Sequence, residues 1–299
     1  MNPTTNVSAS PAMARLARKA GLALTLAIMT GAGLQGCTAA LARPVQARPA
    51  QLQRAHQPTT QPRTIVLVHG AWMGAWAWEG VTAALRQQGD EVLVLDLPGH
   101  GDDATPLDKV SLDAYAKAVI QTIGTRDHVT LVGHSLAGVV ISAVAEAIPT
   151  QLDRLVYVAA YMPRTGESLY ALAQQDKESH TGRYWVQSDP EHYSPATVKD
   201  EGLRDVFCAD CTDAQLAALA KRQRPEAVPP MATPVTLTPA RYGSVPRDYV
   251  ETTQDHCVST TLQEAMIAHT PVQRVIKLAS SHSPFFSHPQ ALADAIAPR

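Results

Sequence analysis

A serine, a histidine and an aspartate in this sequence have the order and surroundings that nucleophilic catalysis needs. Ser135 lies in LVGHSLAGVVISAV, residues 131–144, where a short apolar run meets a longer one. The small residues two positions before and after it, Gly133 and Ala137, are typical of a tight strand-to-helix turn that lifts a nucleophile above a sheet. Ala137 replaces the commoner glycine, but alanine is also small. The pattern therefore predicts that Ser135 attacks a carbonyl group.

A serine hydroxyl needs a base to remove its proton and an acid to orient that base. In proteins with this turn the acid and then the base follow the serine, each after a later strand. We predict His282 as the base because it lies between a strand and the last helix; His288 is the alternative, although it resembles the start of that helix. We predict Asp255 as the acid because it follows a strand; Asp248 is the alternative, but it begins the same strand.

Two backbone N–H groups are expected to stabilise the negative oxygen of a tetrahedral intermediate. One belongs to Leu136, directly after the nucleophile at the start of a helix, where the helix dipole also favours negative charge. The other belongs to the loop after the first strand, formed by His69, Gly70 and Ala71. His134 must point away from the serine across the turn, so we interpret it as structural. We interpret His100 as a hydrogen-bonding residue of its loop.

The elements that must position these residues begin at Thr64, where short apolar runs start to alternate with helical stretches. Continuous apolar strands separated by helices indicate an α/β fold with a mostly parallel sheet covered on both faces. We predict strands at 65–69, 91–97, 129–132, 155–160, 248–253 and 272–279, and helices at 77–88, 112–123, 136–148, 260–269 and 289–296.

Residues 162–236 interrupt this alternation. The segment is richer in polar residues and proline, contains helical pieces such as 213–222, and lies between two strands of the same plan. We therefore predict one domain, 64–299, in which this insertion forms a cap over the carboxyl edge of the sheet. Candidates for lining a pocket are one of Trp72, Trp76 and Trp78 and, in or near the cap, Tyr161, Met162, Tyr184 and Trp185.

The cysteines do not indicate a metal centre. Cys208 and Cys211 form a CxxC, but a structural zinc site needs a second pair of ligands that the sequence lacks, so no metal is expected. In an exported protein they could form a disulfide with each other or with Cys257, or remain free thiols. No glycine-rich phosphate loop follows a strand, so neither a nucleotide nor another cofactor is expected.

The N-terminal segment, residues 1–37, is typical of a bacterial secretion signal. Three basic residues precede an uncharged apolar stretch at 21–34 that is too short to span a membrane comfortably. The following Leu-Gln-Gly-Cys resembles the lipobox of bacterial lipoproteins, in which Cys37 is lipidated; cleavage near Ala47 is the alternative, and Met13 is an alternative start. These features predict an exported protein, either periplasmic or held at the outer membrane by a lipid anchor.

Composition separates this N-terminal part from the rest. Residues 38–63 are rich in Pro, Gln, Ala and Arg without hydrophobic periodicity, which predicts a disordered tether. The chain of 299 residues has a net charge of −2, but residues 1–63 hold seven basic and no acidic side chains, which leaves 18 basic and 27 acidic side chains for the remainder. This acidic balance argues against a nucleic-acid partner.

Most of residues 64–299 is covered by five motifs whose order and spacing fit one family. They are LVHGAWMGAWAW at 67–78, DLPGHGDD at 96–103, GHSLAG at 133–138, YVETTQD at 249–255 and HSPFFSHP at 282–289. Together they resemble the α/β hydrolases, specifically the branch of plant methylesterases, hydroxynitrile lyases and their bacterial esterase relatives. The resemblance implies a helical cap over an apolar pocket, a triad of Ser135, Asp255 and His282, and oxyanion donors at Ala71 and Leu136.

Two positions separate ester hydrolysis from the lyase chemistry of that branch. Its lyases need a threonine directly after the histidine of the first strand and a lysine directly after the catalytic histidine, whereas this sequence has Gly70 and Ser283. We therefore expect a serine esterase that cleaves a small-molecule carboxylic ester of modest size through an acyl-enzyme. Hydroxynitrile lyase-type cleavage and a non-catalytic surface binding protein of the same fold are the alternatives.

Overall fold

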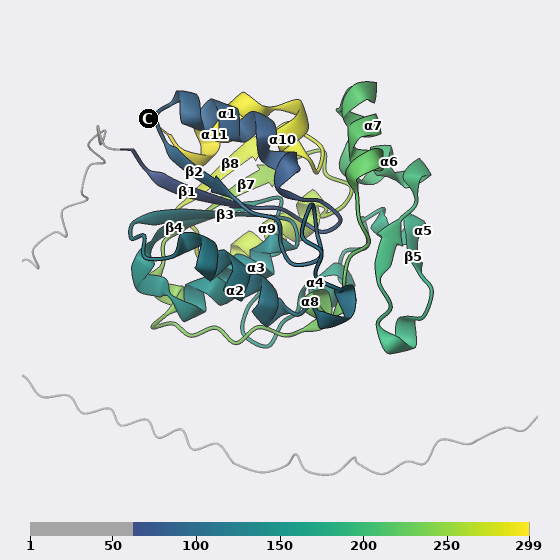
Figure 1. The fold of residues 1–299 in the computed structure, drawn as a ribbon, viewed down its shortest axis with the longest axis horizontal. Coiled ribbons are helices and arrows are strands. Elements are labelled where there is room, and N and C mark those ends of the chain that lie inside the picture. Colours follow the sequence, from purple (N-terminus) through teal and green to yellow (C-terminus); the bar gives the residue numbers. More distant parts are fainter. Residues whose placement is uncertain (1–61, 299) are drawn as a thin grey trace, which may run out of the picture. The chain divides into compact units, whose positions relative to one another are not determined.

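A computed structural model describes residues 62–298, and one central sheet organises them (Figure 1). All six strands of this sheet run parallel, in the order β2-β1-β3-β4-β7-β8. The predicted α/β fold with a parallel sheet is therefore confirmed. The strands are β1 (Thr64–Val68), β2 (Glu91–Val94), β3 (Val129–His134), β4 (Leu152–Val158), β7 (Arg247–Thr252) and β8 (Arg274–Leu278).

Helices cover both faces of this sheet. Figure 1 shows α1, α10 and α11 on one side of the strands and α2 and α3 on the other. The side chains of β3 are buried throughout its length, which is why the central strands appear in the sequence as continuous apolar runs. The helices around the sheet are α1 (Glu79–Gln87), α2 (Leu112–Ile123), α3 (Ala137–Ala147), α9 (Thr260–His269), α10 (Pro284–Ser287) and α11 (Pro289–Ile296).

Most predicted elements are present, and the differences at their ends have local causes. α2, α9 and α11 have the predicted bounds, and the Ser111 hydroxyl accepts a backbone N–H of the first turn of α2 at 3.1 Å. β4 ends at Val158 because Ala159 has a φ of +46°, outside the extended region. β2 ends at Val94, earlier than predicted. Beyond it the Asp96 carboxylate accepts the backbone N–H groups of Ala75 and Asp102, which belong to two different loops.

The cap, residues 162–236, lies between β4 and β7 in the sequence. It was expected to be helical, but it also contains a two-stranded antiparallel sheet. Strands of three residues are too short to reveal an alternating pattern in the sequence. The cap elements are α4 (Leu169–Ala173), α5 (Thr181–Tyr184), β5 (Trp185–Gln187), β6 (Ala196–Val198), α6 (Leu203–Phe207), α7 (Asp213–Arg222) and α8 (Val228–Ala232).

The predictions for the N-terminal part are not addressed by this fold. The secretion signal with Cys37 and nearly all of the tether at 38–63 lie outside the described residues. Within residues 62–298, none of the helices combines the length and the apolar character needed to cross a membrane.

α3 approaches the chain after β4 so closely that only glycine fits near its start. A Cβ atom on Gly138 would lie 2.0 Å from the carbonyl oxygen of Tyr161 and 2.9 Å from its carbonyl carbon. Both are backbone atoms, which cannot move aside as the end of a flexible side chain can. This approach fixes α3, and therefore the turn before it, against the segment that follows β4.

We expect Gly138→Ala to lower the free energy of unfolding by at least about 1–3 kcal/mol, the usual cost of overpacking a filled site. Gly182→Ala is the matched control, because no atom lies within 4 Å of a Cβ built there, and it should leave stability unchanged or slightly raised. Urea unfolding followed by circular dichroism measures both variants. Equal midpoints for Gly138→Ala and the wild type would contradict the close approach.

Candidate active site

Ser135 occupies a strained turn between β3 and α3. Its φ of +53° lies in the left-handed region, which costs a non-glycine residue about 1–2 kcal/mol. The turn also needs small neighbours, since a Cβ on Gly133 would lie 2.8 Å from the Ala137 carbonyl oxygen. Two backbone hydrogen bonds hold it: Ser135 N–H donates to Val158 at 3.2 Å, and Tyr161 N–H donates to the Ser135 carbonyl at 3.1 Å. The predicted strand-turn-helix around Ser135 is present.

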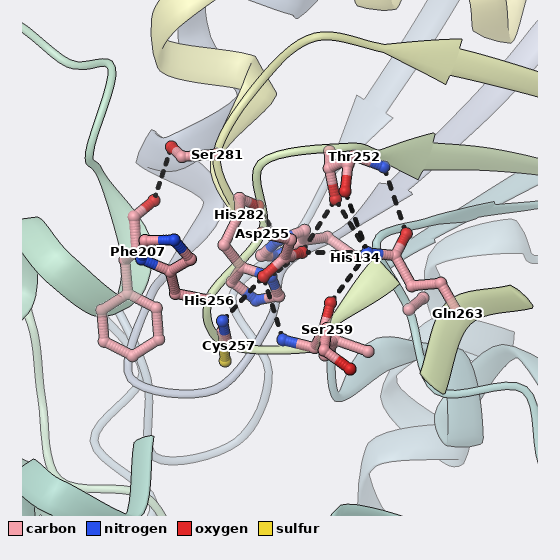
Figure 2. A network of polar contacts seen from close by, with 12 residues as sticks. His134, Phe207, Thr252, Asp255, His256, Cys257, Ser259, Gln263, Ser281 and His282 are labelled. Atoms are coloured by element: carbon pink, nitrogen blue, oxygen red, sulfur yellow. Dashed lines mark hydrogen bonds and ion pairs between the residues drawn. The ribbon is translucent and has the colours of Figure 1, made fainter. Parts of the chain in front are cut away.

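The structure brings Asp255 and His282 together at the ends of β7 and β8. His282 Nδ1 lies 2.8 Å from Asp255 Oδ2. The carboxylate also accepts the backbone N–H groups of Cys257 and Val258, at 2.7 and 2.9 Å, and the Thr252 hydroxyl at 2.8 Å (Figure 2). These donors satisfy the oxygens of the buried carboxylate and leave it little freedom to rotate away from the imidazole.

The charge on His282 depends on the same neighbours. Burial alone would lower its pKa, but the Asp255 carboxylate and the nearby Cys257 thiol raise the pKa above the usual value for histidine. The other ring nitrogen, Nε2, is buried and has no hydrogen-bond partner within residues 62–298. A buried nitrogen without a partner is costly to keep. Among the described residues, Nε2 makes no hydrogen bond to the Ser135 hydroxyl.

His134 supports His282 through a backbone contact. Its Nε2 donates to the His282 carbonyl oxygen at 2.8 Å, and the two ring centroids are 4.6 Å apart. Burial, together with the charge of His282, holds the pKa of His134 well below its usual value, so the ring is neutral. Since a carbonyl can only accept, the single proton sits on Nε2. These contacts agree with the structural interpretation of His134.

The alternative base and acid lie elsewhere. His288 is 43% exposed at its side chain, and its Nδ1 lies 3.6 Å from Asp210. Asp248 is buried near the start of β7, where its Oδ2 pairs with Arg154 at 2.9 Å and Arg274 at 2.6 Å. Neither residue contacts the pair formed by Asp255 and His282.

A cavity of about 430 Å³ opens beside Ser135. Ala71 and Leu136 line this cavity. Their backbone N–H groups donate no hydrogen bond within the described chain. The wall is otherwise mostly apolar, with Asp176 as its one acidic residue. Of the aromatic and methionine candidates from the sequence, Trp72, Tyr161 and Trp185 line the cavity, whereas Trp76, Trp78, Met162 and Tyr184 do not.

The cysteines divide between the cap and the cavity. Cys208 and Cys211 form a disulfide with each other, one of the pairings that the sequence left open. Cys257 is a buried free thiol on the cavity wall. Its place beside His282 was not predicted, although its position two residues after Asp255 was a signal that the thiol would lie near the site.

Glu226 of the cap is a second residue that the sequence did not indicate. It is buried beneath the loop after β1, where its carboxylate accepts the Trp72 backbone N–H at 3.3 Å and the Tyr115 hydroxyl at 2.7 Å. His100 Nε2 lies 2.9 Å from the same carboxylate. Trp72 has a φ of +63° and directly follows Ala71. Glu226 therefore holds a strained loop that carries one of the expected oxyanion donors.

The ion pair between His100 and Glu226 makes stability depend on pH. Burial lowers the pKa of His100, but the Glu226 carboxylate raises it by more than burial lowers it. The pKa of His100 therefore lies above the usual value for histidine. A raised folded-state pKa means that the pair stabilises the fold fully below the unfolded pKa of about 6.5 and loses this contribution as pH rises through the folded pKa.

We expect Glu226→Ala to lower the free energy of unfolding at pH 6 by roughly 3–5 kcal/mol, because it leaves a buried charge without its partner. The loss should shrink as pH rises through the raised pKa of His100 and the ring loses its charge, so the second measurement is made at pH 9. Asp189→Ala, which breaks the exposed pair with His192, is the control and should change stability very little. Chemical denaturation at both pH values measures the difference, and a loss independent of pH would contradict the ion pair.

Comparisons with known proteins agree with this fold and its motifs. Residues 65–295 match the model of the alpha/beta hydrolase family. The chain is 33% identical over 240 residues to "Putative methylesterase 11, chloroplastic" of Arabidopsis thaliana, a match that covers 76% of this chain and only 61% of that protein. It is 30% identical over 234 residues to Methylesterase 8 of Arabidopsis thaliana, covering 77% of this chain and 86% of that one.

A solved structure shows the same likeness of fold. The crystal structure of polyneuridine aldehyde esterase matches with a TM-score of 0.72 at 21% identity, over 79% of this chain and 98% of that chain. This protein belongs to the α/β hydrolase family, in the branch that contains the plant methylesterases.

Proposed function

We propose that this protein is a serine esterase that cleaves a carboxylic ester of modest size. The observation that carries the proposal is the buried hydrogen bond between Asp255 and His282, which leaves His282 Nε2 without a partner. The ring of His134, which directly precedes Ser135, packs against the same imidazole, with the ring centroids 4.6 Å apart. Relatives named methylesterases support an ester as the substrate.

In the proposed reaction, Ser135 Oγ attacks the ester carbonyl carbon while His282 Nε2 takes its proton. The imidazolium that forms is stabilised by Asp255 at Nδ1. The N–H groups of Ala71 and Leu136 bind the negative oxygen; losing one such donor typically costs about 10²–10³-fold in rate. The alcohol then leaves with the proton from Nε2. Water, deprotonated by the same nitrogen, attacks the acyl-serine and releases the acid.

The cavity favours neutral, apolar substrates. Its volume of about 430 Å³ suits a small ester, and its apolar wall includes the side chains of Trp72, Leu169 and Met231. Asp176 carries the negative charge of the wall and already accepts three backbone N–H groups, at 2.8–3.2 Å. A substrate carboxylate near Asp176 would be repelled, so we propose esters without a free acid group.

The alternative lyase chemistry is disfavoured by space as well as by sequence. A Cβ on Gly70 would lie 2.6 Å from His134 Nδ1 and 2.9 Å from the Ser135 Cβ. The threonine expected of a lyase at this position would therefore collide with the turn that holds the nucleophile. The lysine is absent as well, because Ser283 follows His282.

We expect Ser135→Ala and His282→Gln each to reduce kcat/KM for a short chromogenic aryl ester by at least about 10³-fold, because the nucleophile and base act as one unit. His288→Gln is the matched control: it removes the alternative base, whose side chain is largely outside the core, and should keep activity near that of the wild type. Steady-state kinetics measures all three variants.

Three results would contradict this assignment. Loss of activity in His288→Gln with retention in His282→Gln would make His288 the base. A folded wild type that hydrolyses no ester across a range of acyl and alcohol sizes, with mandelonitrile cleavage instead, would favour the lyase. If the folded wild type has neither activity, the remaining alternative is a non-catalytic binding protein.

We also propose that the protein is exported and anchored through a lipid on Cys37. The Cys208–Cys211 disulfide supports export, because disulfides persist mainly in oxidising compartments. In a bacterium that expresses the full chain, we expect the wild type in the membrane fraction and Cys37→Ser in the soluble periplasmic fraction. Equal distribution of the two would contradict the anchor, and cytoplasmic retention of both would contradict export.

A further inference from the structure

Two histidines and a carboxylate outside the proposed catalytic site converge between the cap and the core. His180 precedes α5, Asp205 lies in α6, and His256 follows Asp255 in the loop after β7, where Figure 2 shows it beside the catalytic pair. The Nδ1 atoms of His180 and His256 lie 2.9 and 3.0 Å from one oxygen, Asp205 Oδ1. A ligand atom of each of the three residues lies within 4.8 Å of the other two.

This spacing matches the ligands of a single divalent transition-metal ion. Zinc binds histidine nitrogen and carboxylate oxygen at about 2.0–2.2 Å in a tetrahedral arrangement, so two ligands of one ion are separated by about 3.3–3.6 Å. The two nitrogen–oxygen distances to Asp205, 2.9 and 3.0 Å, are a few tenths of an ångström shorter, so a small rotation of the side chains would admit the ion. Two imidazoles with one carboxylate favour zinc over magnesium or calcium, which prefer oxygen ligands.

The surroundings hold the carboxylate of Asp205 in a fixed orientation. Its oxygens accept hydrogen bonds from the rings of His180 and His256, at 2.9–3.0 Å. Among the described residues, no lysine or arginine, whose charge would repel a cation, forms an ion pair with Asp205. The Tyr184 hydroxyl donates to Oδ2 at 3.3 Å, the kind of outer contact that orients a ligand in metal sites.

The cluster is accessible and already assembled. The side chains of His180, Asp205 and His256 are 23%, 30% and 42% exposed, so an ion can enter and water can complete its coordination. The backbone N–H of His180 donates to the His256 carbonyl at 2.8 Å, and the ring centroids are 4.4 Å apart. These contacts hold two ligands together independently of any ion, which lowers the cost of ordering them on binding.

We propose that His180, Asp205 and His256 bind a divalent transition-metal ion, zinc foremost, which fastens the cap to the loop that carries Asp255. Two ligands come from the cap and one from the core, so the bound ion links the two parts directly. The site is distinct from the CxxC, which the disulfide occupies. It does not depend on the proposed esterase activity.

The test uses the full chain without an affinity tag. We expect the wild type to bind one equivalent of Co²⁺, seen by its visible absorption, and Zn²⁺ at a hundredfold its Kd to raise Tm by about 5–10 °C. His180→Gln, His256→Gln and Asp205→Asn should each abolish the Tm rise and the cobalt spectrum. Each variant is compared with its own metal-free form, so a lower basal Tm does not obscure the result.

The control is His192→Gln, which removes an exposed histidine paired with Asp189 alone and should keep both signals. Absence of the cobalt spectrum and of the Tm rise in the wild type would overturn the proposal and leave a hydrogen-bonded cluster. Signals that persist in all three cluster variants would also overturn it, because the ion would then bind elsewhere.

Discussion

The hydrogen bond between Asp255 and His282 is the contact on which the rest of the site depends. The two residues are 27 positions apart, and they meet because β7 and β8 are neighbours whose parallel register ends with Thr252 opposite Leu278. A buried carboxylate is tolerated only when its charge is compensated. The loop after β7 does this with backbone donors, and Gln263 of α9 fixes the loop by bonding the Thr252 and Val258 carbonyl oxygens at 3.2 and 2.8 Å.

Backbone strain is concentrated at the same edge of the sheet. Trp72, Ser135 and Ala159, in the segments after β1, β3 and β4, all have positive φ values of +46° to +63°. Such residues persist only where surrounding contacts hold them. For Trp72 the buried Glu226 of the cap supplies one of these contacts. The cap therefore does more than cover the cavity, because it also stabilises the conformation of a core loop.

The sequence predicted the parts of this arrangement that depend on local pattern. Ser135, Asp255 and His282 could be chosen as candidates because each follows an apolar strand, and the bounds of α2 followed from its apolar periodicity and from the flanking Ser111 and Gly124. Contacts between distant segments without periodicity could not be predicted. Trp72 and Glu226 are 154 residues apart, and nothing in the composition of the cap indicates which core loop a glutamate will reach.

The same limit applies to the cap itself. Its β5 and β6 strands pair over three residues, too few for alternation to be recognised, and the cluster around Asp205 joins two cap segments to the loop after β7. Gly138 appears in the sequence only as the end of the GHSLAG motif, and the reason that only glycine fits there, the carbonyl of Tyr161, comes from the segment after β4. Packing between elements, which a single sequence does not encode locally, accounts for these omissions.

The most direct measurement is the rate at which a fluorophosphonate modifies Ser135, followed against pH by peptide mass spectrometry in the wild type and in Asp255→Asn. Because Asp255 raises the pKa of His282, its loss should move the acid limb of the rate profile to lower pH and slow the reaction by about 10²–10⁴-fold. Modification of another residue, or identical profiles for the two proteins, would contradict a serine activated by the paired imidazole.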